Sequence, residues 1–149
     1  MNDIQDLYRD LIVEHYRNPR NFREIANANR KASGHNALCG DKFSVFLYMD
    51  DGRIADIRFV GSGCAIATAS ASIMTESLKG KTENEARALF RSFLDLLSGD
   101  PDPGETAALG DLSVFSGVRG YPARIKCAAF AWHIFLAALD GKEQPVETD

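Results

Sequence analysis

Cysteine is scarce in this sequence, with three residues among 149, and no pairing scheme could use all three within one chain. A reducing cytosol would keep them as thiols, so their value must lie in packing, reactivity or metal binding. The motifs of phosphate-binding loops, dinucleotide-binding folds, nucleophile elbows and His-Glu-x-x-His zinc proteases are absent from the sequence. These absences leave the thiols as the main candidates for chemistry.

Long apolar runs and an excess of basic charge are missing as well. The longest apolar stretch, residues 127–139, contains His133 and is shorter than the about 20 residues that span a bilayer. The 17 basic and 21 acidic residues give a net charge of -4, which offers no electrostatic reason to bind nucleic acid or an anionic membrane. Residues 1–6 do not resemble a secretory signal. We therefore expect a cytoplasmic protein with neither nucleic acid nor membrane as a partner.

The hydrophobic content of 45% over 149 residues predicts one domain, residues 1–149, with its own core. Apolar residues at helical spacing predict helices over residues 4–16, 65–79, 82–98 and 122–139. Residues 100–110 are rich in Pro, Gly and acidic residues, which is typical of a surface loop, and 112–118 are expected to pack as a short apolar element. The tail, residues 142–149, is expected to fray.

Two apolar segments, residues 42–49 and 53–60, flank Asp50-Asp51-Gly52 and predict an antiparallel hairpin with a tight turn. Alternation along the second segment predicts which of its residues point into the core: Ala55, Ile57 and Phe59. Residues 27–38 are more polar, and we interpret them as a loop or a poorly marked edge strand.

A thiol and a carboxylate lie two residues apart in Cys39-Gly40-Asp41, just before the first predicted strand. The glycine between them gives the backbone the freedom to turn both side chains toward one point. Both groups can ligate a cation. The alternative is a buried thiol beside a solvated carboxylate, because free cysteine is commonly buried, and spacing alone does not decide between the two.

The other two cysteines are each expected near the N-terminal end of a helix. Cys64 follows Gly61-Ser62-Gly63, which we interpret as a tight strand-to-helix turn, and the helix dipole there would lower its thiol pKa. Cys127 follows Arg124 and Lys126, two cations that could stabilise its thiolate. Plain packing is the alternative for both thiols.

The start of a strand at Cys39 and the starts of two helices at Cys64 and Cys127 can converge on one edge of a small sheet. The predicted ligand set has three thiols and one carboxylate: Cys39, Asp41, Cys64 and Cys127. This set suits Zn²⁺, and thiolates also suit iron–sulfur chemistry, so composition does not choose between them. We expect His15 and His133 at the core edge or the surface and keep only His35 as a spare ligand.

Motifs spread over nearly the whole chain carry a family resemblance. They are Tyr8-Arg9-Asp10, His15-Tyr16-Arg17-Asn18-Pro19-Arg20-Asn21, Asn36-Ala37-Leu38-Cys39-Gly40-Asp41, Gly61-Ser62-Gly63-Cys64-Ala65-Ile66-Ala67, Lys79-Gly80-Lys81-Thr82 and Lys126-Cys127-Ala128. Together they resemble the U-type iron–sulfur cluster assembly family, which includes IscU, the N-terminal domain of NifU, and SufU. Lys126 stands where IscU-type members carry histidine, and residues of about 100–121 form an extra segment. Both features are similar to the SufU branch.

The resemblance implies an α+β fold of the SufE/IscU type, in which helices pack on a small antiparallel β-sheet, and a metal site made of the four predicted ligands. It also implies a PLP-dependent cysteine desulfurase as partner, with iron–sulfur assembly or apo-acceptor proteins downstream. A SufU-like protein would hold zinc and carry persulfide sulfur, as a sulfurtransferase-like partner rather than a stand-alone enzyme. An IscU-like scaffold would hold a nascent [2Fe–2S] cluster for transfer.

If the protein is a SufU-like sulfur carrier, we expect Cys39 to be the sulfur acceptor, because a glycine-hinged loop lets it move while helices anchor Cys64 and Cys127. Arg124 is expected to assist, by pairing with Asp41 or by holding the released thiolate. A third class stays open, in which a closed structural zinc site holds the fold of an interaction module and no thiol reacts.

Overall fold

The structure is a computed structural model that describes residues 3–37, 39–99, 109–142 and 146–148. In chain order its elements are α1 (Asp3–Arg17), β1 (Arg30–Asn36), β2 (Asp41–Asp50), β3 (Arg53–Ser62), α2 (Ala65–Leu78), α3 (Glu83–Ser98), the 3-10 helix η1 (Gly110–Val118), α5 (Pro122–Leu139) and β4 (Val146–Thr148). The α-helices agree with the predicted segments. None of the described helices is long and apolar enough to cross a membrane.

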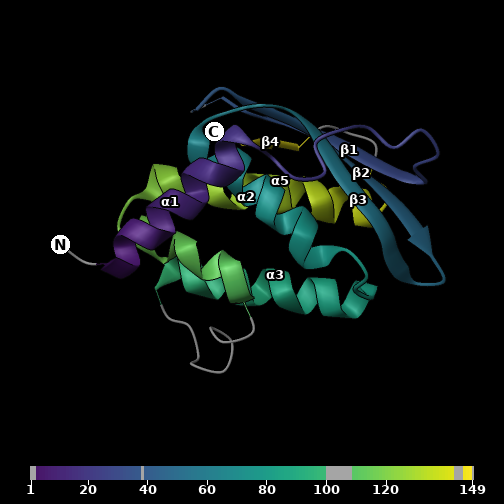
Figure 1. Cartoon of the computed structure of the whole chain (residues 1–149). Helices are drawn as coiled ribbons and strands as arrows, with labels where there is room; N and C mark the ends of the chain where they lie inside the picture. The colour runs from purple at the N-terminus through teal and green to yellow at the C-terminus, as the bar shows by residue number, and fades with distance from the viewer. Residues whose placement is uncertain (1–2, 38, 100–108, 143–145, 149) are drawn as a thin grey trace.

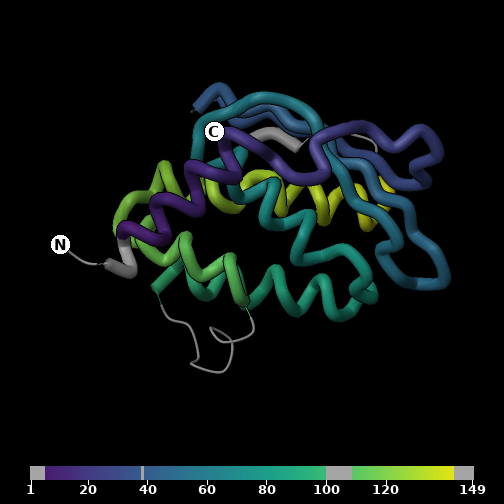
Figure 2. Tube along the Cα trace, viewed as in Figure 1, coloured from purple at the N-terminus to yellow at the C-terminus, as the bar shows by residue number. Residues whose placement is uncertain are grey.

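The helices pack on the sheet in two tiers (Figure 1). α5 contacts β1 and β2, and α2 contacts β3, so these two helices lie directly against the sheet. α1 and α3 pack on this pair, and η1 contacts each of the α-helices in the described part of the chain. Figure 2 shows the sheet on one side of the molecule and α3 on the opposite side, with α5 between them. The result is an α+β fold, as the resemblance implies.

The sheet has the strand order β3-β2-β1-β4, with antiparallel pairing among the first three strands. Residues 30–36, which the sequence marked only as loop or weak edge strand, form the full strand β1. β4 pairs with β1 in parallel, opposite Gly34 to Asn36. Residues 146–148 therefore differ from the expected frayed tail, because the polar edge of β1 supplies hydrogen-bonding partners that no local pattern reveals.

The predicted inward face of β3 is correct for Ile57 and Phe59 and wrong for Ala55. Ile54 is fully buried and Ala55 is exposed. The cause is a β-bulge: Tyr48 pairs with Asp56 and Met49 pairs with Ile54, which leaves Ala55 as an extra residue. An extra residue reverses the alternation of inward and outward side chains. On the N-terminal side of the bulge, the residue that was expected to face outward therefore points into the core.

Residues 100–108 of the extra segment lie outside the described residues. The remainder forms η1, which packs as the predicted short apolar element, with four side chains buried: Leu112, Val114, Phe115 and Val118. Just after it, Arg119 donates from Nε to the carbonyl oxygen of Leu96 at 2.9 Å. This hydrogen bond ties the end of η1 to α3.

Candidate metal centre

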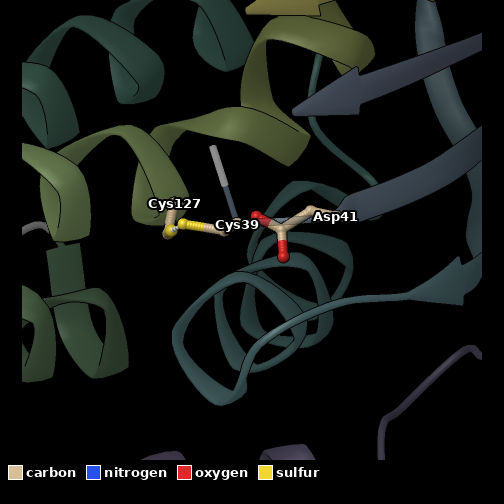
Figure 3. Close-up of side chains that lie close together, drawn as sticks. All are labelled: Cys39, Asp41 and Cys127. Carbon is tan, nitrogen blue, oxygen red and sulfur yellow. Dashed lines mark hydrogen bonds between the residues drawn. The ribbon is translucent and has the colours of Figure 1, made fainter. Parts of the chain in front are cut away.

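Two thiols and a carboxylate from distant parts of the chain meet in one place (Figure 3). Cys39 lies in the short loop between β1 and β2, Asp41 opens β2, and Cys127 lies in the second turn of α5. The Sγ atoms of Cys39 and Cys127 lie 2.8 Å apart, although 88 positions separate them in the sequence. The possible ligand atoms of all three residues lie within 4.8 Å of one another.

Gly40 makes this meeting possible. Its φ of +71° lies in the left-handed region that favours glycine. Because of this turn, the thiol before it and the carboxylate after it approach Cys127 together. The structure gives the glycine the role that the sequence predicted for it.

The carboxylate of Asp41 is fully buried and bound on both oxygens. Oδ2 accepts a hydrogen bond from Asn36 Nδ2 at 3.2 Å, and Oδ1 accepts one from the backbone N–H of Cys64 at 2.9 Å. Sequence reasoning missed Asn36. Only the β1–β2 register, which places Asn36 opposite Asp41, could have revealed it, and β1 itself was poorly marked.

The glycines before Cys64 are explained by close approach. A side chain at Gly63 would put its Cβ 2.6 Å from Asp41 Oδ1 and 3.1 Å from the Phe43 ring. At Gly61 a Cβ would clash with the backbone of Lys42 on the neighbouring strand. The Gly-Ser-Gly sequence is therefore a tight strand-to-helix turn that lets α2 begin against the carboxylate.

Cys64 is the N-cap residue of α2 and lies just outside the group of three ligand atoms. Its Sγ accepts a hydrogen bond from the Ala67 backbone N–H at 3.4 Å, which turns the sulfur toward its own helix. The same thiol also interacts with Cys127. This half-buried side chain would have to turn away from its own helix to join the group as a fourth ligand.

Both helix thiols favour their neutral form in the described structure. Burial raises the pKa of Cys64 by more than the Ala67 amide lowers it. Burial, followed by the hydrogen bond with Cys39, raises the pKa of Cys127 strongly. The predicted lowering of the Cys64 pKa by its helix is therefore wrong for the metal-free chain. At Cys127, where the sequence left a cation-stabilised thiolate and plain packing open, the buried position favours packing. A metal cation would reverse this balance, since coordinating thiols are deprotonated.

Arg124 does not reach the carboxylate in this structure. Its guanidinium lies 4.6 Å from the centroid of the exposed Tyr121 ring, while Asn36 and Cys64 occupy the oxygens of Asp41. The auxiliary role of Arg124 thus stays a prediction that requires the side chain to move.

The histidines lie away from the three ligands. His15 is 2% exposed and bonds Ser72, whereas His133 is exposed. His35 is half-buried and alternates with the buried Gly34 and Asn36, so it points to the opposite face of β1. The spare-ligand role considered for His35 has no support in this geometry.

The chemistry of the donor set fits a thiophilic metal. Two sulfurs and a carboxylate oxygen are grouped, and a third sulfur lies beside Cys127. Zinc accepts such mixed sulfur and oxygen ligands, and iron–sulfur clusters require thiolates.

Comparison with known proteins identifies the family. The model of the NifU-like N terminal domain matches residues 7–128, a span that contains all four predicted ligands. The chain belongs to the NifU-like N-terminal domain family. This membership confirms the resemblance drawn from the sequence motifs.

Relatives of this NifU-like chain cover most of its length. It is 37% identical over 130 residues to the zinc-dependent sulfurtransferase SufU of Bacillus subtilis, covering 87% of each chain. It is 32% identical over 139 residues to the iron-sulfur cluster assembly scaffold protein IscU of Streptococcus pyogenes, covering 93% of this chain and 86% of the relative. A solved structure from Fervidobacterium islandicum, described as an iron-sulfur cluster assembly scaffold for the SUF system, is similar with a TM-score of 0.81 and 31% identity, covering 87% of this chain and 94% of that one.

Proposed function

We propose that this NifU-like protein acts in iron–sulfur cluster assembly as a zinc-dependent acceptor and carrier of persulfide sulfur, with a PLP-dependent cysteine desulfurase as the donor. The observation that carries the proposal is the position of Cys39, a half-buried thiol on a glycine-hinged loop against the buried Cys127. The name of the Bacillus subtilis relative supports it. So does Lys126, which stands where IscU-type members carry histidine.

Zinc fits the residues that the structure brings together. Cys39, Asp41 and Cys127 would hold it, and Cys64 would complete a four-ligand set. Bound zinc would supply the positive charge that keeps these thiols deprotonated despite their burial.

The transfer step requires only the persulfide and a thiolate. Cys39 Sγ attacks the outer sulfur of the donor's persulfide, a new S–S bond forms on Cys39, and the donor's own S–S bond breaks. The donor cysteine leaves as a thiolate, so electrons balance without an added oxidant or reductant. Cys127 lies in a packed helix and cannot move out in the same way, which favours Cys39 as the acceptor.

The test is to incubate the zinc-loaded protein with a cysteine desulfurase and L-cysteine, and then to locate added sulfur by mass spectrometry of alkylated peptides. We expect the sulfur on Cys39, and we expect stimulated desulfurase turnover that Cys39→Ala abolishes. His35→Ala changes a neighbouring side chain on the other strand face and serves as the matched control. Sulfur carried by Cys39→Ala as readily as by the unchanged chain would refute the proposal.

The second candidate is a scaffold that assembles a [2Fe–2S] cluster as its cargo. The same thiols suit it, and the Streptococcus pyogenes relative is named as such a scaffold. Anaerobic reconstitution followed by transfer to an apo-ferredoxin tests this candidate. A cluster that forms and transfers, without desulfurase stimulation by the zinc-loaded protein, would favour the scaffold over the sulfur carrier.

A further inference from the structure

Asn36 lies where a ligand-orienting residue would be expected, although it is no ligand of the predicted set. It is the last residue of β1, fully buried, and directly opposite Asp41 in the β1–β2 register. Its Nδ2 donates a hydrogen bond to Asp41 Oδ2 at 3.2 Å. This hydrogen bond satisfies the buried amide and at the same time fixes the direction of a carboxylate at the candidate metal centre.

The two hydrogen bonds on Asp41 come from two different elements. Asn36 belongs to the sheet, whereas the Cys64 N–H at 2.9 Å from Oδ1 belongs to the start of α2. Each carboxylate oxygen carries two lone pairs, so one hydrogen bond on each still leaves capacity for a cation. The carboxylate is thus oriented by groups that lie outside the loop carrying Cys39.

We propose that Asn36 is a positioning residue, which keeps the Asp41 carboxylate oriented toward the metal while Cys39 engages sulfur. This inference rests on the proposed function. Asn36 and Asp41 are paired strand residues on either side of Cys39, so their pairing holds the carboxylate independently of the Cys39 thiol. Partners of this kind fix the direction of a ligand and hence its affinity for the metal.

The test compares zinc affinity by chelator competition in the full chain, with Co²⁺ absorption as a probe of coordination. Asn36→Ala should weaken zinc binding by roughly 10- to 100-fold and alter the Co²⁺ spectrum. His35→Ala, one residue away on the other strand face, should change neither. Asn36→Ser keeps a hydroxyl donor and should lie between Asn36→Ala and the unchanged chain, and it also replaces Asn36→Ala if that variant fails to fold.

A double-mutant cycle separates positioning from a general structural effect. If Asn36 acts through the carboxylate, Asn36→Ala should cost no further zinc affinity in an Asp41→Ala background. Equal losses in both backgrounds, or unchanged affinity and spectrum in Asn36→Ala, would overturn the inference while leaving the sulfur-carrier proposal intact. An unchanged chain that binds neither metal would overturn both.

Discussion

Cys39 and Cys127 place their sulfur atoms 2.8 Å apart across a boundary between a hinged loop and a packed helix. Ala128 and Phe130, which follow Cys127 in α5, are fully buried. Cys39 instead directly precedes Gly40, whose backbone is left-handed, and it lies in a loop between two strands. One thiol is therefore anchored in a helix and the other is carried by a loop, which is the asymmetry that the proposed sulfur acceptor requires.

This contact predicts how the metal-free chain oxidises. Treated with hydrogen peroxide, it should form a Cys39–Cys127 disulfide, since two neighbouring thiols can give up two electrons and two protons while the peroxide is reduced to water. Mass spectrometry of peptides after alkylation identifies the bond. Zinc-loaded protein should be protected, because its thiols would be engaged. A disulfide that includes Cys64 in place of either thiol would contradict the arrangement.

Cys64→Ser separates the role of that residue as the N-cap of α2 from its predicted role as a metal ligand. Serine is a strong N-cap, so the cap on α2 should survive, and the unfolding free energy of the metal-free chain should stay level or rise by up to about 1 kcal/mol. Zinc affinity should fall, because a hydroxyl is a poor substitute for a thiolate. Urea unfolding with chelator present and zinc competition measure the two effects.

Cys127→Ser is the matched comparison for this variant. Cys127 is 3% exposed within the apolar part of α5, so a hydroxyl there should lower the unfolding free energy by about 1–3 kcal/mol even without metal.

The zinc affinity of Cys64→Ser decides whether Cys64 is a ligand. If this variant bound zinc as tightly as the unchanged chain, the ligand set would be limited to the three grouped residues.

The fold was predictable wherever one face of an element is regularly apolar. The helical segments and the hairpin follow from spacing and from the Asp50-Asp51-Gly52 turn. The segment of β1 was predicted only as a loop or a poorly marked edge strand, because its sequence is small and polar and its strand character depends on pairing with β2. The bulge at Ala55 was missed because nothing in the local pattern reveals an extra residue between paired strands.

The sequence predicted which of the site residues come together better than it predicted their electrostatics. Cys39, Asp41 and Cys127 meet as expected, whereas Cys64 lies beside them with its sulfur on its own helix. The helix dipole suggested a lowered thiol pKa at Cys64, but burial outweighs it, and burial depends on the whole tertiary arrangement. Asn36 could not be found without knowing the strand register.

Gly63→Ala tests the close approach of α2 to the carboxylate. The added Cβ would lie 2.6 Å from Asp41 Oδ1, so either the carboxylate or the helix start must shift, and zinc affinity should fall at least tenfold. Gly117→Ala meets nothing within 4 Å and serves as the control. Zinc competition on both variants checks the prediction, and equal affinities would contradict it.

His15 should make the metal-free chain less stable at mildly acidic pH. It is 2% exposed, and its Nδ1 lies 2.7 Å from Ser72 Oγ, which also accepts the Arg20 backbone N–H at 2.8 Å. The Ser72 hydroxyl proton is then free to donate to a neutral His15. Burial, and secondarily Arg20, lower the pKa of His15 below its usual 6.5, although Glu76 at 3.7 Å acts in the opposite direction.

The sign of the pH effect follows from the protons bound in each state. Below the unfolded pKa of about 6.5, unfolded chains take up a proton on this histidine that folded chains resist, so unfolding becomes easier as pH falls. Urea midpoints measured with chelator present should therefore drop between about pH 7 and pH 5.5. His15→Gln should flatten that drop, whereas His35→Gln on the outer strand face should keep it. An equal drop in the His15→Gln variant would assign the pH dependence to other groups, such as His133, whose pKa is also lowered.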